Sequence, residues 1–121
     1  MKNFIFRKQV GNKGYYVKIN FDVELLNEQK YKLEINYTAD IKWKAFCETG
    51  ILLFFEYFSR KEDSGLKVTI YEVSWLPVDT NAFLVLFSTI KALSEALNYD
   101  INGLGFDETN EKFIFPDPRL I

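Results

Sequence analysis

The feature that most constrains the fold is an unbroken alternation of side chains between residues 15 and 25. Because successive side chains of a strand point to opposite faces, the run predicts a long strand with one buried and one solvated face. A second alternating run covers residues 31–37 after a short polar link, which predicts an antiparallel hairpin between the two runs. The apolar members of the first run are Tyr15, Val17, Ile19, Phe21, Val23 and Leu25, and its polar members are Tyr16, Lys18, Asn20, Asp22 and Glu24.

Helical spacing appears in two later segments. A first helix is predicted from Ile41 to Ser59, with Thr38 or Asp40 as its N-cap. Gly50 lies inside it, where glycine costs about 1 kcal/mol relative to alanine. This glycine predicts either a close approach to a neighbouring backbone or a break into two shorter helices.

The second helix is predicted to begin after Asp79 or Thr80 as N-cap and to bury one stripe of side chains on the sheet. Short β-prone runs at residues 4–10, 66–73 and 113–115 complete the pattern. The order β-β-β-α-β-α, with a possible last strand, predicts one α+β domain over residues 1–121. It would be a two-layer sandwich, a mainly antiparallel four-stranded sheet with two helices packed on one face. The stripe consists of Phe83, Phe87, Ile90, Leu93 and Leu97.

Composition limits the chemistry. The 121 residues include no histidine, which excludes Ser-His-Asp, Cys-His and zinc-histidine sites. The lone Cys47 is either a reactive thiol or a buried inert one, and its apolar surroundings favour the second. Acidic pairs at residues 62–63 and 107–108 lack calcium-loop spacing and indicate solvated linkers rather than a cation site. We therefore predict no catalytic residue, no cofactor and no metal.

Charge and hydropathy limit the partners and the location. The formal net charge of −2 disfavours binding to free DNA or other free nucleic acid. The longest apolar run, residues 50–55, is far shorter than the roughly 20 residues that cross a bilayer. The N-terminus lacks a signal-peptide pattern, and a single cysteine forms no internal disulfide. These features predict a soluble, cytoplasmic protein without a membrane partner and leave the oligomeric state open.

Several strings, spread over nearly the whole chain, resemble one known family. The strongest resemblance lies in Val68 to Ala96, which contains the turn Pro77-Val78-Asp79-Thr80 and the start of an Ala-Phe helix. Together with the order of elements, these strings resemble domain IV of elongation factor G and of tetracycline-resistance ribosomal protection proteins, a ribosomal protein S5 domain 2-like fold. The other matching strings are Phe4 to Val10, Tyr15 to Ile19, Ala45 to Ile51 and Phe113 to Pro116.

The resemblance implies a site. In those factors the domain projects its tip loops into the decoding region of the ribosome, and a separate GTPase domain drives the engagement. This chain has no Gly-x-x-x-x-Gly-Lys-Ser/Thr phosphate loop, so the resemblance implies a freestanding domain without the GTPase. Leu76 stands where the factors carry a tip histidine, and the stretch from Asp79 to Phe83 is shorter than theirs. The implied partner-binding loop consists of Trp75, Leu76, Pro77, Val78, Asp79 and Thr80.

Residues of this loop also have purely structural interpretations. Trp75 either inserts into a partner or folds back onto the sheet edge, and the usual burial of large aromatic side chains favours the second. Leu76 is therefore the better candidate for a contact. Asp79 and Thr80 are interpreted as helix caps rather than catalytic groups.

A second candidate surface is the polar face of the predicted sheet, which mixes aromatic and basic side chains that can stack on bases. Acidic residues at positions 22, 24 and 34 interrupt this face, so a plain solvated face or a protein-binding face explains it equally well. The possible contacts on it are Tyr16, Lys18, Lys32, Lys67 and Tyr71.

The sequence supports two hypotheses of function. In the first, the chain is a non-enzymatic binding module that docks on the ribosome or another RNA-protein surface through residues 75–80. In the second, it is a protein-protein interaction module, such as an immunity, antitoxin or accessory protein, that reuses the same fold. An enzyme ranks below both, because no convergent set of residues supports one.

Overall fold

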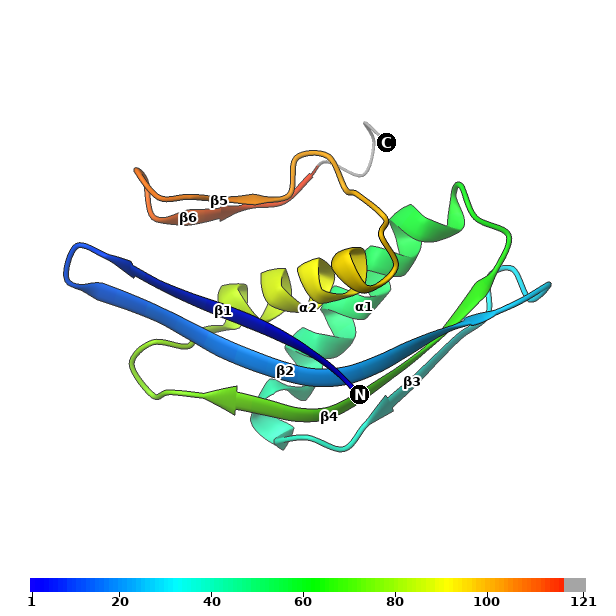
Figure 1. Ribbon diagram of the computed structural model, residues 1–121, viewed down its shortest axis with the longest axis horizontal. Helices are drawn as coiled ribbons and strands as arrows, with labels where there is room; N and C mark the ends of the chain where they lie inside the picture. Colours follow the sequence, from blue (N-terminus) through cyan, green and yellow to red (C-terminus); the bar gives the residue numbers. More distant parts are fainter. Residues whose placement is uncertain (117–121) are drawn as a thin grey trace.

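The computed structural model has two layers, a curved sheet and a pair of helices that lie on its concave face (Figure 1). The structure describes residues 1–116. This arrangement confirms the predicted α+β sandwich with two helices on one face. The elements in chain order are β1 (Lys2–Val10), β2 (Lys13–Leu26), β3 (Leu33–Tyr37), the 3₁₀ helix η1 (Ile41–Trp43), α1 (Lys44–Ser59), β4 (Gly65–Trp75), α2 (Ala82–Ala96), β5 (Gly105–Asp107) and β6 (Lys112–Ile114).

The strand order of the main sheet is β1-β2-β4-β3. β2 is antiparallel to both β1 and β4, whereas β3 is parallel to β4. The predicted hairpin between residues 15–25 and 31–37 is therefore wrong, because β4 occupies the edge of β2 that the later run would have used. β3, α1 and β4 instead form a β-α-β unit, in which a helix joins two parallel strands.

The link between β2 and β3 passes across the start of β4. The backbone N–H of Leu66 donates to the carbonyl oxygen of Lys32 at 2.9 Å. A Cβ at Gly65 would meet that same oxygen and would lie 2.5 Å from the carbonyl oxygen of Gln29. Only glycine fits where the link passes.

β4 contains a bulge that preserves its buried face. Up to Ile70 every second side chain faces the core; Tyr71 and Glu72 are then both exposed, and Val73 resumes the buried face. The pairing with β2 shifts by one residue at this point. The extra residue turns the end of the strand, so that Trp75 also points to the core side.

The two helices pack against each other closely. α1 runs without a break, and a Cβ at Gly50 would lie 2.9 Å from the Cβ of Thr89 and 3.1 Å from the carbonyl oxygen of Leu86 in α2. Of the two interpretations of this glycine, the close approach is confirmed. Cys47 is buried on the same helix, as predicted.

Some predicted positions differ from the structure. Asp40 caps η1, where its carboxylate accepts from the backbone N–H of Lys42 at 2.9 Å, and α1 begins only afterwards. Phe83 was expected in the core but is 66% exposed, because the first turn of α2 directs Leu84 inward instead. Leu25 is also exposed, since it lies beyond the helix pair beside a shallow hollow at the C-terminal end of both helices.

The last predicted strand pairs outside the main sheet. β6 forms a separate antiparallel hairpin with β5, and the hairpin lies on the helix side of the sheet, over β1 and β2 (Figure 1). The ring centroids of Phe106 and Phe113 lie 5.7 and 5.9 Å from that of Phe6 in β1. Phe87 of α2 lies 5.0 Å from Phe113. Aromatic packing, rather than strand pairing, therefore attaches the hairpin to the domain.

Within residues 1–116, no helix combines the length and the apolar character needed to span a bilayer.

Candidate binding site at the loop end of the sheet

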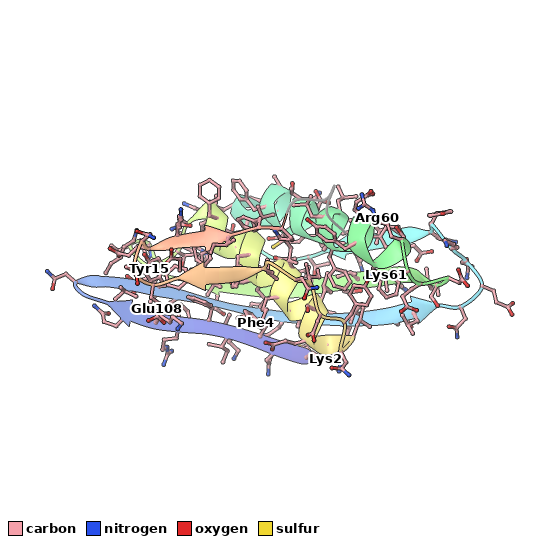
Figure 2. The ribbon with its side chains drawn as sticks, turned by 90° about the horizontal axis from the view of Figure 1, so that it is seen from above. Lys2, Phe4, Tyr15, Arg60, Lys61 and Glu108 are labelled. Carbon is pink, nitrogen blue, oxygen red and sulfur yellow. The ribbon has the colours of Figure 1, made fainter. Side chains whose placement is uncertain are left out.

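Three connections meet at one end of the molecule, which we call the loop end: the β1–β2 turn, the loop of residues 76–81 and the β5–β6 turn (Figure 1). The hydroxyl group of Tyr15 donates to the carboxylate of Glu111 at 3.3 Å, and Lys8 forms an ion pair with Glu108. Figure 2 shows Tyr15 and Glu108 close together at this end of the molecule. Side-chain contacts thus join the β5–β6 turn to β1 and β2, so the loop end is more than three independent turns.

Backbone and side-chain hydrogen bonds fix the loop of residues 76–81 to β2. The backbone N–H of Tyr16 donates to the carbonyl oxygen of Asp79 at 3.0 Å. The buried hydroxyl group of Thr80 donates to the carbonyl oxygen of Tyr16 and accepts from the N–H of Leu76 at 3.0 Å. The N–H of Thr80 also donates to the carbonyl oxygen of Leu76 at 3.1 Å. These bonds close the loop at its base.

The prediction that Asp79 or Thr80 caps α2 is wrong. Asn81 is the N-cap, and its side-chain oxygen accepts from the N–H of Leu84 at 2.9 Å. The two preceding residues already hold the loop against β2, so the helix starts one residue later. Their role is to position the loop.

Trp75 folds back toward the core, as its structural interpretation predicted. Its ring lies 5.5 Å from that of Trp43, and its indole N–H donates to the carboxylate of Asp40 at 3.1 Å. The ammonium group of Lys42 lies 4.6 Å from the ring centroid. Hydrogen bonds from the Lys42 backbone and then from the Trp75 indole lower the pKa of Asp40. Trp75 therefore supports the loop from below.

The apex of the loop is apolar and points into solvent. Leu76 is 46% exposed, Val78 is 90% exposed, and Pro77 between them is exposed as well. We call residues 76–78 the apex. Because hydrogen bonds fix the base of the loop, the apex loses little conformational entropy when a partner binds, which favours binding.

The outer face of the sheet, opposite the helices, divides into two halves. Tyr16 and Lys18 lie in the half at the loop end, where β1 and β2 pair. The other three predicted contacts lie in the far half, and each of them binds an acidic side chain of this chain. These pairs are Lys32–Glu34 at 3.3 Å, Lys67–Glu24 at 3.9 Å and Tyr71–Asp22 at 2.8 Å. The acidic residues that interrupt this face in the sequence are thus separated in space from Tyr16 and Lys18.

Sequence reasoning missed Arg7. It lies directly opposite Tyr16 in the β1–β2 register, and its guanidinium carbon is 5.1 Å from the centre of the tyrosine ring. The signal was present, because the turn around Gly11 fixes the register of the two strands and pairs residue 7 with residue 16. An arginine stacked on a tyrosine forms a cationic and aromatic surface.

An open groove of about 560 Å³ joins this surface to the loop. Residues of β1, of β2 and of the loop line it, so it depends on all three being held together. They are Arg7, Lys8, Gln9, Gly14, Tyr15, Tyr16, Leu76 and Asp79.

The other side chains that could be reactive, Cys47 and Asp107, have structural roles. Burial raises the pKa of the Cys47 thiol to about 11, so that it stays neutral near pH 7. Hydrogen bonds from Asn110 lower the pKa of Asp107, whose carboxylate stabilises the β5–β6 turn. No cluster of three or more cysteine or carboxylate side chains suited to a metal ion occurs in residues 1–116. The loop end offers stacking, apolar contact and hydrogen bonding, which are means of recognition.

The sequence matches no protein-family model and no curated protein. The fold is similar to that of a protein from Thermus thermophilus whose crystal structure superposes with a TM-score of 0.58 and 18% sequence identity. The match covers 78% of this chain and 15% of the Thermus protein, so this chain corresponds to a small part of a much longer one. At this identity the likeness supports the α+β fold alone.

Proposed function

We propose that this chain is a non-enzymatic binding module that docks on an RNA-protein surface through the apex, residues 76–78. The observation that carries the proposal is the exposure of Leu76, Pro77 and Val78 on a loop whose base is fixed to β2. Exposed apolar side chains on a rigid loop are suited to a protein component of such a surface. The ribosome is the candidate surface, because the chain resembles domain IV of elongation factor G, and the compartment we propose is the cytoplasm.

The loop-end half of the outer face supports an RNA component beside the apex. Arg7 and Lys18 form no ion pair with any side chain in residues 1–116, whereas Asp22, Glu24 and Glu34 of the far half are already paired. The alternative, a module whose acidic surface meets a basic protein, draws less support from the structure. On the outer face, Asp22, Glu24 and Glu34 already form ion pairs within the chain.

Capture of ribosomes tests the proposal. We expect the immobilised protein to retain ribosomes at low salt, where electrostatic binding is strongest, and Leu76→Asp or Val78→Asp to lower retention at least tenfold. The matched control is Leu52→Asp, which places the same charge at another exposed leucine, on α1. It should bind normally, and circular dichroism should show all variants folded.

Two results would contradict the proposal. One is equal retention of the wild-type protein and both apex variants. The other is capture of a single stoichiometric protein that RNase treatment leaves unchanged, which is the result expected of the protein-interaction alternative.

A further inference from the structure

We infer that the groove between the apex and the β1–β2 strands binds an unpaired guanine nucleotide of single-stranded RNA. This inference rests on the proposed function, because it names the RNA element that would lie beside the docked apex. A groove of about 560 Å³ is within the size range of small-ligand sites and can hold one nucleotide. Two features of its lining and one cation beside it argue for this ligand.

The first feature is a stacking surface. Arg7 and Tyr16 form a cation–π pair, with 5.1 Å from the guanidinium carbon to the ring centre. The backbone of Tyr16 is fixed by its hydrogen bond to Asp79 and by the bond that its carbonyl oxygen accepts from Thr80. Aromatic rings and guanidinium planes are the groups on which proteins stack unpaired bases.

The second feature is a carboxylate without a donor. The Asp79 side chain is half-buried in the groove wall, with its carboxylate packed against Gly14. None of the N–H or O–H groups in residues 1–116 donates a hydrogen bond to it. A partly buried acceptor of this kind favours a ligand that supplies donors. Guanine presents two neighbouring N–H donors on its Watson–Crick edge, which a carboxylate can accept together, and the other bases offer fewer.

The third feature is a cation for the phosphate. Lys18 lies two residues beyond Tyr16 on the same outer face of β2, so it is roughly 7 Å further along the strand. No carboxylate in the described part of the chain pairs with it. A nucleotide stacked at Tyr16 would place its backbone within reach of this ammonium group. Among residues 1–116, the far half of the face offers no comparable unpaired cation, because Lys32 and Lys67 are bound to Glu34 and Glu24.

Fluorescence anisotropy with labelled single-stranded RNA octamers tests the inference at about 50 mM salt, where phosphate contacts contribute strongly. An octamer of uridines with one central guanosine should bind about tenfold more tightly than octauridine. Asp79→Asn keeps the shape of the side chain and should abolish that difference, because an amide cannot accept two hydrogen bonds from guanine in the same way. Tyr16→Ala or Arg7→Gln should weaken binding of both octamers about tenfold.

Lys18→Gln should weaken binding of both octamers equally and reduce the dependence on salt, as expected of a phosphate contact. Lys67→Gln is its matched control on the far half and should bind like the wild-type protein. Melting curves show whether each variant is folded. If Tyr16→Ala unfolds, Arg7→Gln alone tests the stacking surface.

Equal affinity of the wild-type protein for the two octamers would overturn the inference, as would an unchanged guanosine preference in Asp79→Asn. Free guanosine monophosphate that competes as tightly as RNA would overturn RNA as the source of the base. Val78 lies at the apex and does not line the groove. Ribosome capture that depends on Val78, combined with no guanosine preference, would leave the docking proposal standing and remove this inference alone.

Discussion

Gly50 determines how closely the two helices can pack. Its missing side chain leaves room for the Cβ of Thr89 and for the carbonyl oxygen of Leu86, which would lie 2.9 and 3.1 Å from an added Cβ. A backbone carbonyl cannot rotate away as a flexible side chain can. The helix pair therefore has little room to accommodate even one methyl group.

We expect Gly50→Ala to destabilise the domain by about 1 kcal/mol. Alanine gains about 1 kcal/mol in helix propensity, but overpacking costs about 1–3 kcal/mol, and the second effect should dominate at this contact. Urea unfolding measures the difference. Gly105→Ala is the matched control, since a Cβ there meets open space and should leave the midpoint unchanged. A Gly50→Ala protein more stable than the wild type would refute the close approach.

Residues 79–81 show how far single residues can be predicted from sequence. Aspartate, threonine and asparagine are all good N-caps, so composition alone does not choose between Asp79, Thr80 and Asn81. The choice depends on where the loop pairs with Tyr16 of β2, a residue far away in sequence. Predicting a helix near this position needed only local information, whereas its first residue depended on a tertiary contact.

Among the elements, the β5–β6 hairpin depends most on its side chains. Each strand has only three residues, and a two-stranded hairpin is marginal by itself in water. Phe113 contacts Phe6, Phe87 and Phe106, so its ring joins the hairpin to β1 and to α2.

Phe113→Ala should release the hairpin from the domain at a cost of about 3 kcal/mol, the lower end of the range for buried phenylalanine. Hydrogen exchange should show faster exchange of the amides in residues 105–114, with the main sheet still protected. Ile114→Ala is the control, because Ile114 is 44% exposed, and it should change neither measurement. Uniform loss of protection across β1, β2 and β4 would mean instead that the hairpin is part of the main folding unit.

The strands themselves were easier to predict than their partners. Alternation identified β2 and β3, because the period of the side chains is a local property. Their pairing was wrong, because β4 enters the sheet between them only after α1. The bulge at Tyr71 and Glu72 was likewise not predicted, because the β-prone run of residues 66–73 carries no sign of a shift in its pairing with β2.

At the scale of the whole molecule, the buried Cys47 thiol makes stability depend on alkaline pH. Burial raises its pKa from 9.0 to about 11, so the folded state holds the proton more tightly than the unfolded state. The resulting stabilisation is fully present below pH 9 and is lost as the pH rises through 11. The size of the shift corresponds to about 2–3 kcal/mol at most.

Comparison of the wild-type protein with Cys47→Ala tests this. The variant should be less stable at pH 7, because it lacks buried packing. The difference in free energy of unfolding between the two proteins should then shrink between pH 9 and pH 11. Tyr71 and Tyr99 also have raised pKa values, but Cys47 does not contribute to them, so these two groups titrate alike in both proteins and cancel. A constant difference across this range would contradict the prediction.

Fold class and candidate site were therefore predictable to different depths. Periodicity was sufficient for an α+β sandwich, because burying one face of two helices and one sheet leaves few arrangements. The loop of residues 75–80 was proposed as a site from the resemblance of Pro77-Val78-Asp79-Thr80, and the groove was not predicted. Its walls come from β1, β2 and the loop, and only the folded register brings Arg7, Tyr16 and Asp79 together.

The position of β4 in the sheet also has a mechanical consequence. The apex extends from the end of this strand, and β4 is hydrogen-bonded to β2 on one edge and to β3 on the other. A force applied to the apex along the strand would load both ladders in shear, so their hydrogen bonds would have to break together. The same force on an edge strand would meet only one ladder. A partner that pulls on this loop would therefore move the domain as a rigid body before it extracted the strand.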